Sequence, residues 1–388
     1  MPCDAHCHEG DPLHICVMVH GMGGTCADWQ TWLEVLKHKH PDWILWPLQK
    51  ISRGCRFLGS DLRELSSIAA EEIIEAVKMN EATGSHVMLH CIGHSMGGLI
   101  IRGALLRVLE ECEKLQLGHY ISLSSPHLGI RSSWLHPLHS WRNLCWLSQP
   151  ISNQLVHLAI QDTLGLQTPF LVELSQPESE HMTALGRFDH RTCVSLAFGD
   201  PLIPPASGLI DPYLLMDSHG SLHESFWQLI FDDTWPTCKT IGQQGKAATG
   251  LLKLPAFFFA LMQLLARGLW RLLAAFLGLF CIALPSSARR SQSSAHLSPD
   301  SSPSDSPKAR SRSKLSWELS QDLKCKYPAE VYDGLLSVPW RRVVANAHHR
   351  PIPRNLHVFL IGKRSEQFAK EHQMSRACIE HLADLLLA

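Results

Sequence analysis

The sequence lacks paired cysteines, a charge excess and an N-terminal apolar segment. Its 13 cysteines are odd in number and form no CxxC pair, which argues against a zinc ribbon and a disulfide framework. A formal net charge of -1 provides no overall attraction to nucleic acid or anionic surfaces. The opening MPCDAHCHEGD contains no apolar run, so no secretory signal is visible and we expect an intracellular, reducing setting. The candidate metal ligands Cys3, His6, Cys7 and His8 lie in this segment, which we expect to be disordered.

Short apolar runs alternate with segments of helical spacing along most of the chain. The apolar runs are Leu13–His20, Trp43–Leu48, His86–Ile92, His119–Leu123 and Thr192–Phe198. The helical segments are the one that follows Thr25, then Asp61–Met79, Leu99–Leu115 and Ser375–Leu387. Near-continuous apolar runs are typical of parallel strands buried on both faces. The alternation therefore predicts an α/β fold, with a mostly parallel sheet covered by helices on both faces.

The segment CIGHSMGGLII, Cys91–Ile101, places glycines where a strand would end and a helix begin. GHSMG at positions 93–97 matches the G-x-S-x-G pattern of a nucleophile elbow, in which the serine occupies a strained turn. Side chains two positions before and after this serine would collide, so glycine is needed at both places. The N–H of Met96 then points to where a carbonyl oxygen would become negative, and the helix N-terminus favours that charge. We predict that Ser95 is a nucleophile.

An acyl-transfer site needs a second oxyanion donor, supplied by the loop after an earlier strand. HGMGG at positions 20–24 follows the first apolar run, and its glycines allow the backbone to approach a substrate closely. The N–H of Met22 is our candidate, with Gly23 as the alternative. His94 is adjacent to Ser95 in sequence and cannot easily present its ring to that hydroxyl. We therefore expect His94 and His20 to pack or to support the site.

Four motifs together resemble the putative serine esterase family of eukaryotes: VHGMGGTCADW, GHSMGGLIIRGAL, ISLSSPHLG and AFGDPLIPPASGLI. The family consists of lipase-like α/β-hydrolases and includes yeast phospholipases of the lipid-droplet type. The resemblance covers residues 13–130 well, 190–212 moderately and 335–388 loosely, and it fails over 236–325. It implies an α/β-hydrolase fold and a Ser-Asp-His triad that acts on carboxyl esters of lipids.

The triad acid should follow a later strand, because the chain order in α/β-hydrolases is Ser, acid, His. Asp200 comes directly after the apolar run that ends at Phe198, and the family pattern has an aspartate there. Asp211 and Asp217 are rivals. A turn-forming role for Asp200 beside Pro201 is the structural alternative.

The triad base is harder to choose, because the chain contains 24 histidines. Chain order restricts the candidates to His348, His349, His357, His372 and His381. HVFLIGK from His357 resembles the run at which the family histidine lies. We choose His357, with His348 next. A further histidine, His127 in the SSPHLG motif, either lines the pocket at the sheet edge or is an ordinary loop residue.

Three segments depart from the alternating pattern. Residues 126–190 are long for a connection and form a possible lid or cap. Residues 250–285 are almost wholly apolar, and Gln263, Arg267 and Arg271 would share one stripe of a helix, which suits a membrane interface. A buried core helix is the alternative for this insert. Residues 286–325 are rich in Ser and Pro and read as a disordered linker.

We predict a catalytic domain of residues 12–235 and 326–388, an α/β-hydrolase that cleaves lipid esters through Ser95, Asp200 and His357. The oxyanion hole is assigned to Met22 and Met96. No metal or cofactor and no nucleic-acid partner is expected. The expected partners are a lipid ester and, through 250–285, a membrane or lipid-droplet surface. The alternatives are a thioesterase for lipidated protein and an inactive scaffold that tethers partners at a membrane.

Overall fold

The computed structural model describes residues 12–54, 60–81, 86–130, 153–158, 160, 168–197, 200, 202–212, 214, 238–241, 327, 329–347, 356–363 and 369–386. All of them belong to one compact unit. The predicted apolar insert, residues 250–285, and the predicted linker, residues 286–325, lie outside the described residues, as does Cys3–His8. No helix within the described ranges has both the length and the apolar character needed to cross a membrane.

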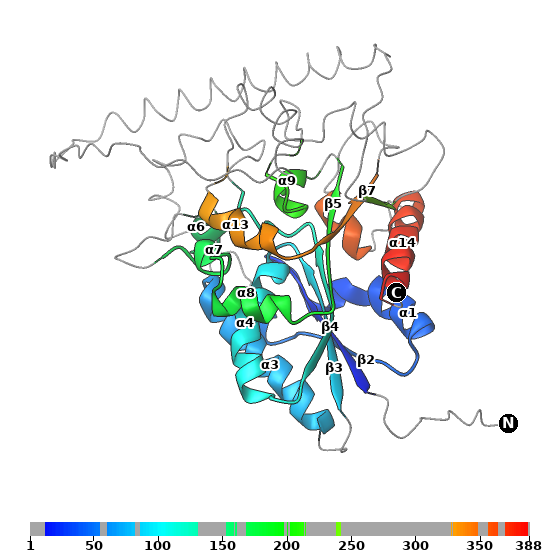
Figure 1. Ribbon diagram of the computed structural model, residues 1–388. Coiled ribbons are helices and arrows are strands. Elements are labelled where there is room, and N and C mark those ends of the chain that lie inside the picture. The colour runs from blue at the N-terminus through cyan, green and yellow to red at the C-terminus, as the bar shows by residue number, and fades with distance from the viewer. Residues whose placement is uncertain are drawn as a thin grey trace, which may run out of the picture. The chain divides into compact units, whose positions relative to one another are not determined.

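In the described part of the chain, seven strands form one sheet in the order β2-β1-β3-β4-β5-β7-β6 (Figure 1). All neighbouring pairs are parallel except β6 and β7, which are antiparallel. The strands are β1 (Leu13–Val19), β2 (Ile44–Pro47), β3 (Val87–His94), β4 (Gln116–Leu123), β5 (His190–Leu196), β6 (Cys238–Ile241) and β7 (Arg341–Ala345). The mostly parallel sheet predicted from the apolar runs is confirmed. The short edge strand β6 was not predicted, because its sequence, CKTI, contains no continuous apolar run.

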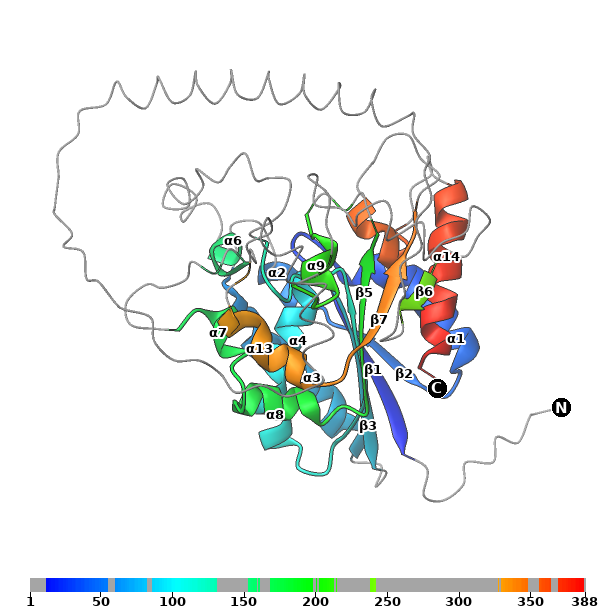
Figure 2. The ribbon, with the colours of Figure 1, turned by 45° about the horizontal axis from the view of Figure 1, so that its top comes forward.

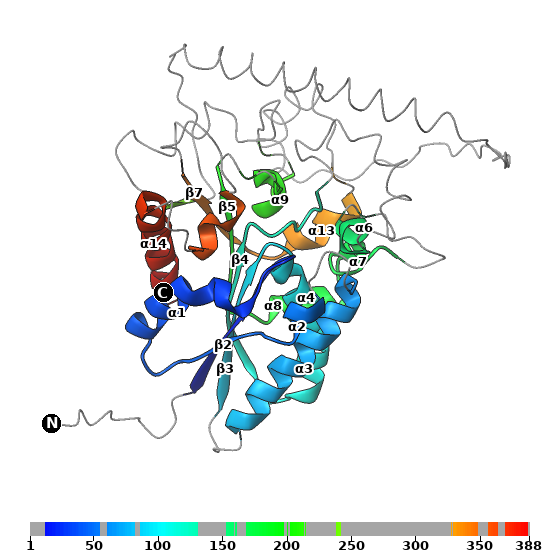
Figure 3. The ribbon, with the colours of Figure 1, turned by 180° about the vertical axis from the view of Figure 1, so that it is seen from behind.

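Helices cover both faces of the sheet, as Figures 1 and 3 show from opposite sides. One face packs against α3 (Leu62–Glu81), α4 (Met96–Glu111) and α8 (Glu180–Gly186), and the other against α1 (Gln30–Lys39), α14 (Ala369–Asp384) and η3 (Leu356–Ile361). The shorter elements are η1 (Cys26–Trp29), α2 (Ile51–Gly54), α6 (Asn153–Leu158), α7 (Phe170–Glu173), α9 (Pro205–Gly208) and α13 (Ala329–Ser337). Of these, α6 and α7 lie within the possible lid, together with α8, whose buried side chains belong to the core.

Side chains of β1 alternate between two separate cores. Ile15, Val17 and Val19 belong to the core beneath α3 and α4, whereas Cys16 and Met18 belong to the core beneath α1 and α14. This division follows from the two-residue period of a strand. Both sets are fully buried, which explains why the sequence of β1 is apolar without interruption.

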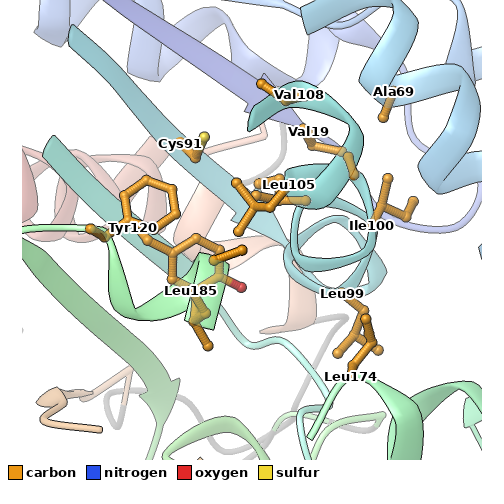
Figure 4. Packing of buried hydrophobic residues seen from close by; sticks show 14 of the residues in the cluster. Val19, Ala69, Cys91, Leu99, Ile100, Leu105, Val108, Tyr120, Leu174 and Leu185 are labelled. Carbon is orange, nitrogen blue, oxygen red and sulfur yellow. The ribbon is translucent and has the colours of Figure 1, made fainter. Parts of the chain in front are cut away.

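Helix α4 is held by apolar contacts along most of its length. Leu99, Ile100, Leu105 and Val108 are buried against the sheet and the neighbouring helices, part of which Figure 4 shows. Complete burial of one such side chain stabilises the fold by about 1.5–3 kcal/mol. This packing fixes the start of α4, and therefore the turn that joins it to β3.

The face beneath α1 and α14 carries a row of stacked aromatic rings that crosses the sheet. The row consists of His40, Trp43, His14, His90, His119 and His190. His90 stacks on Trp43 at 4.2 Å between ring centroids and on His119 at 5.4 Å. Nδ1 of His90 accepts a hydrogen bond from the backbone N–H of His119 at 3.1 Å. Burial, followed by the neighbouring histidines, lowers the pKa of His90 to about 2, and burial with His190 lowers that of His119 to about 4.

We expect this row to make the fold sensitive to acid. A histidine in the unfolded chain has a pKa near ~6.5, so below that pH the unfolded state binds protons that folded His90 does not. The free energy of unfolding should therefore fall by about 1.4 kcal/mol per pH unit for each such histidine as the pH decreases below ~6.5. Urea unfolding of the full chain between pH 7.5 and 5 measures this slope. His90→Gln, which cannot titrate, should reduce it.

His38→Gln is the control for that measurement, because His38 is an exposed histidine of α1 outside the row. It should leave the slope of the wild-type chain unchanged. A slope in His90→Gln equal to that of the wild type would contradict the assignment of acid sensitivity to the row.

Candidate active site

Ser95 is the single residue that connects β3, which ends at His94, to α4, which begins at Met96. Its backbone has φ 54° and ψ -126°, a region that residues with a side chain rarely occupy. The N–H of Ser95 donates to the carbonyl oxygen of Leu123, the last residue of β4, at 2.8 Å. The strained turn predicted for a nucleophile elbow is therefore present, and Ser95 is 8% exposed.

The glycines around Ser95 are required by close packing. A Cβ on Gly97 would lie 2.0 Å from the carbonyl oxygen of Val19 in β1. A Cβ on Gly93 would lie 2.5 Å from the backbone nitrogen of Gly98. Any larger residue at either position would push α4 away from the sheet, and Ser95 would lose its strained backbone.

The loop after β1 lies against Ser95. A Cβ on Gly21 would be 2.7 Å from Cβ of Ser95 and 3.2 Å from its Oγ. The N–H of Gly24 donates to the carbonyl oxygen of Gly21 at 3.1 Å, and this turn does not use the N–H of Met22. The N–H of Met96 belongs to the first residue of α4, where helical geometry provides no intrahelical acceptor. Met96 thus follows the serine in the chain, and Met22 follows Gly21, which lies against the serine.

His20 anchors this loop. Its Nδ1 is 3.0 Å from the carbonyl oxygen of Gly21, and its Nε2 is 2.8 Å from Oγ of Ser52 in α2. Because a carbonyl oxygen only accepts, Nδ1 carries the proton and Nε2 accepts from the hydroxyl of Ser52. Burial lowers the pKa of His20, which keeps the ring neutral. The supporting position expected for His20 agrees with these contacts.

Asp200 and His357 form a desolvated pair. Nδ1 of His357, in η3, lies 3.0 Å from Oδ2 and 3.2 Å from Oδ1 of Asp200, which follows β5. The His357 side chain is 8% exposed and that of Asp200 is 1% exposed. Oδ1 of Asp200 also accepts the backbone N–H groups of Leu202 and Ile203 at 2.9 and 3.0 Å.

The charge of Asp200 is stabilised despite its burial. Desolvation alone would raise the pKa of this carboxyl group, but His357 and the N–H groups of Ile203 and Leu202 outweigh it and hold the pKa below its ordinary value. A carboxylate that stays ionised while buried is suited to orient an imidazole and to stabilise its protonated form.

His357 lies beside the residue that precedes Ser95. The ring centroids of His94 and His357 are 4.7 Å apart, and Nε2 of His94 donates to the carbonyl oxygen of His357 at 2.8 Å. Within the described ranges, no hydrogen bond joins Oγ of Ser95 to His357. Such catalytic hydrogen bonds are often long in unliganded enzymes and shorten when substrate binds.

The other candidates for acid and base fall elsewhere. Asp211 follows α9, and the carboxylate bonded to His357 is that of Asp200 instead. His381 is in α14, where its Nε2 is buried without a hydrogen-bond partner. Asp217, His348 and His349 lie outside the described residues, as does the side chain of His372.

His127 lies in the turn after β4, and its side chain is buried in the core. It is completely buried, its Nε2 is 2.8 Å from Oγ of Ser122, and its Nδ1 is 3.3 Å from the guanidinium of Arg102. Arg102 also donates to the carbonyl oxygen of Leu174 at 2.6 Å and to Oγ of Ser175 at 3.0 Å. His127 is thus a buried loop residue that contacts Arg102 of α4, and its complete burial speaks against the pocket expectation. The described residues contain no group of three or more ligating side chains placed to hold a metal ion.

The family model described as "putative serine esterase" matches residues 9–210, more than half of the chain. The chain belongs to this family. With the observed sheet and elbow, this membership establishes an α/β-hydrolase fold and an esterase-type hydrolase. The match includes Ser95, Asp200 and the loop of Met22, and ends before His357.

Several solved structures are similar over part of their length. The RedJ thioesterase from Streptomyces coelicolor is 20% identical, with TM-score 0.30, over 54% of this chain and 81% of that one. Phospholipase PlaB from Legionella pneumophila is 17% identical, with TM-score 0.31, over 48% and 40%. A cutinase-like protein from Cryptococcus sp. is 13% identical, with TM-score 0.24, over 31% and 57%. This serine esterase family member thus spans less than two thirds of the last two proteins.

The contact between Gly21 and Ser95 predicts the effect of one methyl group. Gly21→Ala should displace the loop from Ser95, because its Cβ would lie 2.7 Å from that of the serine. A displacement near 1 Å in such a site lowers rates by on the order of 100-fold. Hydrolysis of a soluble p-nitrophenyl ester measures the loss. Gly186→Ala is the control, since no heavy atom lies within 4 Å of its Cβ position, and it should retain wild-type activity. Equal activity in both variants would contradict this account of the loop.

Proposed function

We propose that this protein hydrolyses carboxyl esters of lipids, with Ser95 as nucleophile, His357 as general base and Asp200 as the carboxylate that orients it. The observation that carries the proposal is the bond from His357 to Asp200, which joins residues 157 positions apart in a desolvated site. A second support is the strained backbone of Ser95. This residue directly follows His94, whose ring contacts the ring of His357.

The proton positions follow from the hydrogen bonds. A carboxylate only accepts, so Nδ1 of His357 carries the hydrogen that points to Asp200. Nε2 of His357 is then the basic nitrogen, and it removes the proton from Ser95 Oγ as that oxygen attacks the ester carbonyl. Asp200 remains ionised and stabilises the imidazolium that forms.

The remaining steps release the two products. The N–H groups of Met22 and Met96 hold the negative oxygen of the tetrahedral intermediate. The intermediate collapses to an acyl-serine as the imidazolium of His357 donates its proton to the leaving alcohol. A water molecule, deprotonated by His357, then attacks the acyl-serine, and the acid leaves with restoration of the Ser95 hydroxyl.

A lipid substrate is supported by the sequence beyond the catalytic residues. Residues 254–284 are almost wholly apolar, and Arg267 and Arg271 divide the run near its middle. Two arginines at the centre of a bilayer would cost several kcal/mol, whereas a helix in the interface can direct them to the headgroups. An enzyme that reacts with glycerophospholipids or acylglycerols gains from residence at the surface that holds them.

Labelling of Ser95 tests the catalytic assignment. A fluorophosphonate probe should label the full chain, and Ser95→Ala should abolish the label because the reactive oxygen is removed. His357→Ala and Asp200→Asn should each lower ester hydrolysis by on the order of 1,000-fold or more. Ser67→Ala, at an exposed serine of α3, is the control and should behave as the wild type.

An unlabelled wild-type chain would indicate an inactive scaffold and would overturn the proposal. If the label persists in His357→Ala but is lost in His348→Ala, the base has been assigned to the wrong histidine. Faster turnover of acyl-cysteine thioesters than of matched lipid esters would identify a thioesterase for lipidated protein instead.

Membrane association is tested by flotation with liposomes of phosphatidylcholine and phosphatidylserine. We expect the full chain to float and a chain without residues 250–285 to remain at the bottom. Removal of residues 287–322, a segment of equal length that lies wholly within the polar linker, is the matched control and should leave flotation unchanged. Equal recovery of the two deletion variants with the liposomes would count against an interfacial role for 250–285.

A further inference from the structure

His94 and Ser95 are consecutive, but their side chains serve different parts of the molecule. His94 is the last residue of β3 and shares the parity of Ile92, which belongs to the core beneath α1 and α14. The alternation of a strand therefore directs its ring to the face that η3 covers. The ring is buried, with 5% of the residue exposed.

On that face His94 meets the backbone of the proposed base. Its Nε2 lies 2.8 Å from the carbonyl oxygen of His357, and the two rings lie at 4.7 Å with an angle of 44° between their planes. Because the carbonyl oxygen is an acceptor, Nε2 of His94 must carry the hydrogen. Burial, followed by the proximity of His357, lowers the pKa of His94 to about 3, although Asp200 and Asp28 oppose this shift. The His94 ring is therefore neutral and does not repel an imidazolium at His357.

The rest of η3 is held by other elements. Nε1 of Trp32 and Oγ1 of Thr31, both in α1, donate to the carbonyl oxygens of Leu360 and Gly362 at 2.9 Å each. Oγ of Ser375, in α14, donates to the carbonyl oxygen of Phe359 at 2.5 Å. These contacts fix the C-terminal part of η3. Residue 357 itself is held by Asp200 at its side chain and by His94 at its carbonyl oxygen.

We propose that His94 is a positioning residue for His357: its hydrogen bond to the His357 carbonyl oxygen sets the distance from the base to Ser95. The strand that carries the nucleophile thus also holds the backbone of the base, one residue from the serine. This inference rests on the proposed function of His357. It predicts a loss in the chemical step without a comparable loss in substrate binding, since the Nε2 donor of His94 is used by the His357 carbonyl oxygen and its ring faces η3.

Two substitutions of similar shape test the role of the hydrogen bond. His94→Gln keeps an N–H donor at nearly the same distance from the backbone, and His94→Met fills similar space without a donor. With a soluble p-nitrophenyl ester, we expect His94→Met to lower kcat by on the order of 10- to 100-fold while KM changes by less than about twofold. His94→Gln should restore most of kcat.

The thermal midpoint of each variant separates positioning from packing. If His94→Met does not fold, His94→Phe replaces it, because phenylalanine keeps the ring contact and removes the donor. Wild-type kcat in the variant without a donor would overturn the inference. Equal losses in kcat in the Gln variant and the variant without a donor would also overturn it, since the donor would then make no difference.

The two proposals fail in different ways. If the wild type hydrolyses the ester through Ser95 but the donor at position 94 is irrelevant, only the role of His94 is wrong. If the wild type is inactive and Ser95→Ala changes nothing, both the proposed function and this inference are overturned.

Discussion

The backbone of Ser95 is the constraint on which the site depends. A residue with φ 54° is unfavourable for an L-amino acid, so it persists only where the surroundings determine it. Here the hydrogen bond to Leu123, the close approach of Gly97 to β1 and the apolar packing of α4 act together. The backbone strain at Ser95 is thus offset by the packing of the core, which also fixes β3 before the serine and α4 after it. The outcome is a serine in a strained turn at the carboxyl end of β3, directly before the first residue of α4.

The second requirement is a buried carboxylate that remains charged. Burial of an isolated carboxylate is unfavourable, and the fold compensates Asp200 with two backbone N–H groups and the imidazole of His357. These partners come from the turn after β5 and from η3, which are far apart in the chain. Their meeting depends on the parallel sheet, because the carboxyl ends of its strands lie at one edge. Figure 2 shows β5 and β7 side by side in the same part of the molecule.

The two faces of the sheet have different chemistry. The face beneath α3 and α4 is mostly apolar and supports the helix that follows Ser95, although it also contains buried polar side chains such as Arg102 and His127. The face beneath α1 and α14 holds the row of stacked histidines and also η3 with His357. His90 and His94 lie four residues apart on the same face of β3, yet His90 stacks on Trp43 and His119 whereas His94 contacts the proposed base. Identical residue types on one strand therefore have separate roles, decided by what packs against each.

The sequence alone determined the strand and helix alternation and the elbow at Ser95, and it supplied the hypothesis that Met22 and Met96 are oxyanion donors, because these features depend on residues close together in the chain. It also placed Asp200 by chain order, and chose His357 from five histidines by family resemblance. Tertiary structure decided that His357 contacts Asp200, that His127 is core and that His94 holds the His357 backbone. Each of these contacts joins separate elements. The two-residue period of a strand predicts which side chains share a face of the sheet, but it does not predict which helix or loop covers that face. Asp200 and His357 are 157 positions apart in the chain, and only the folding of the sheet and η3 brings them into contact.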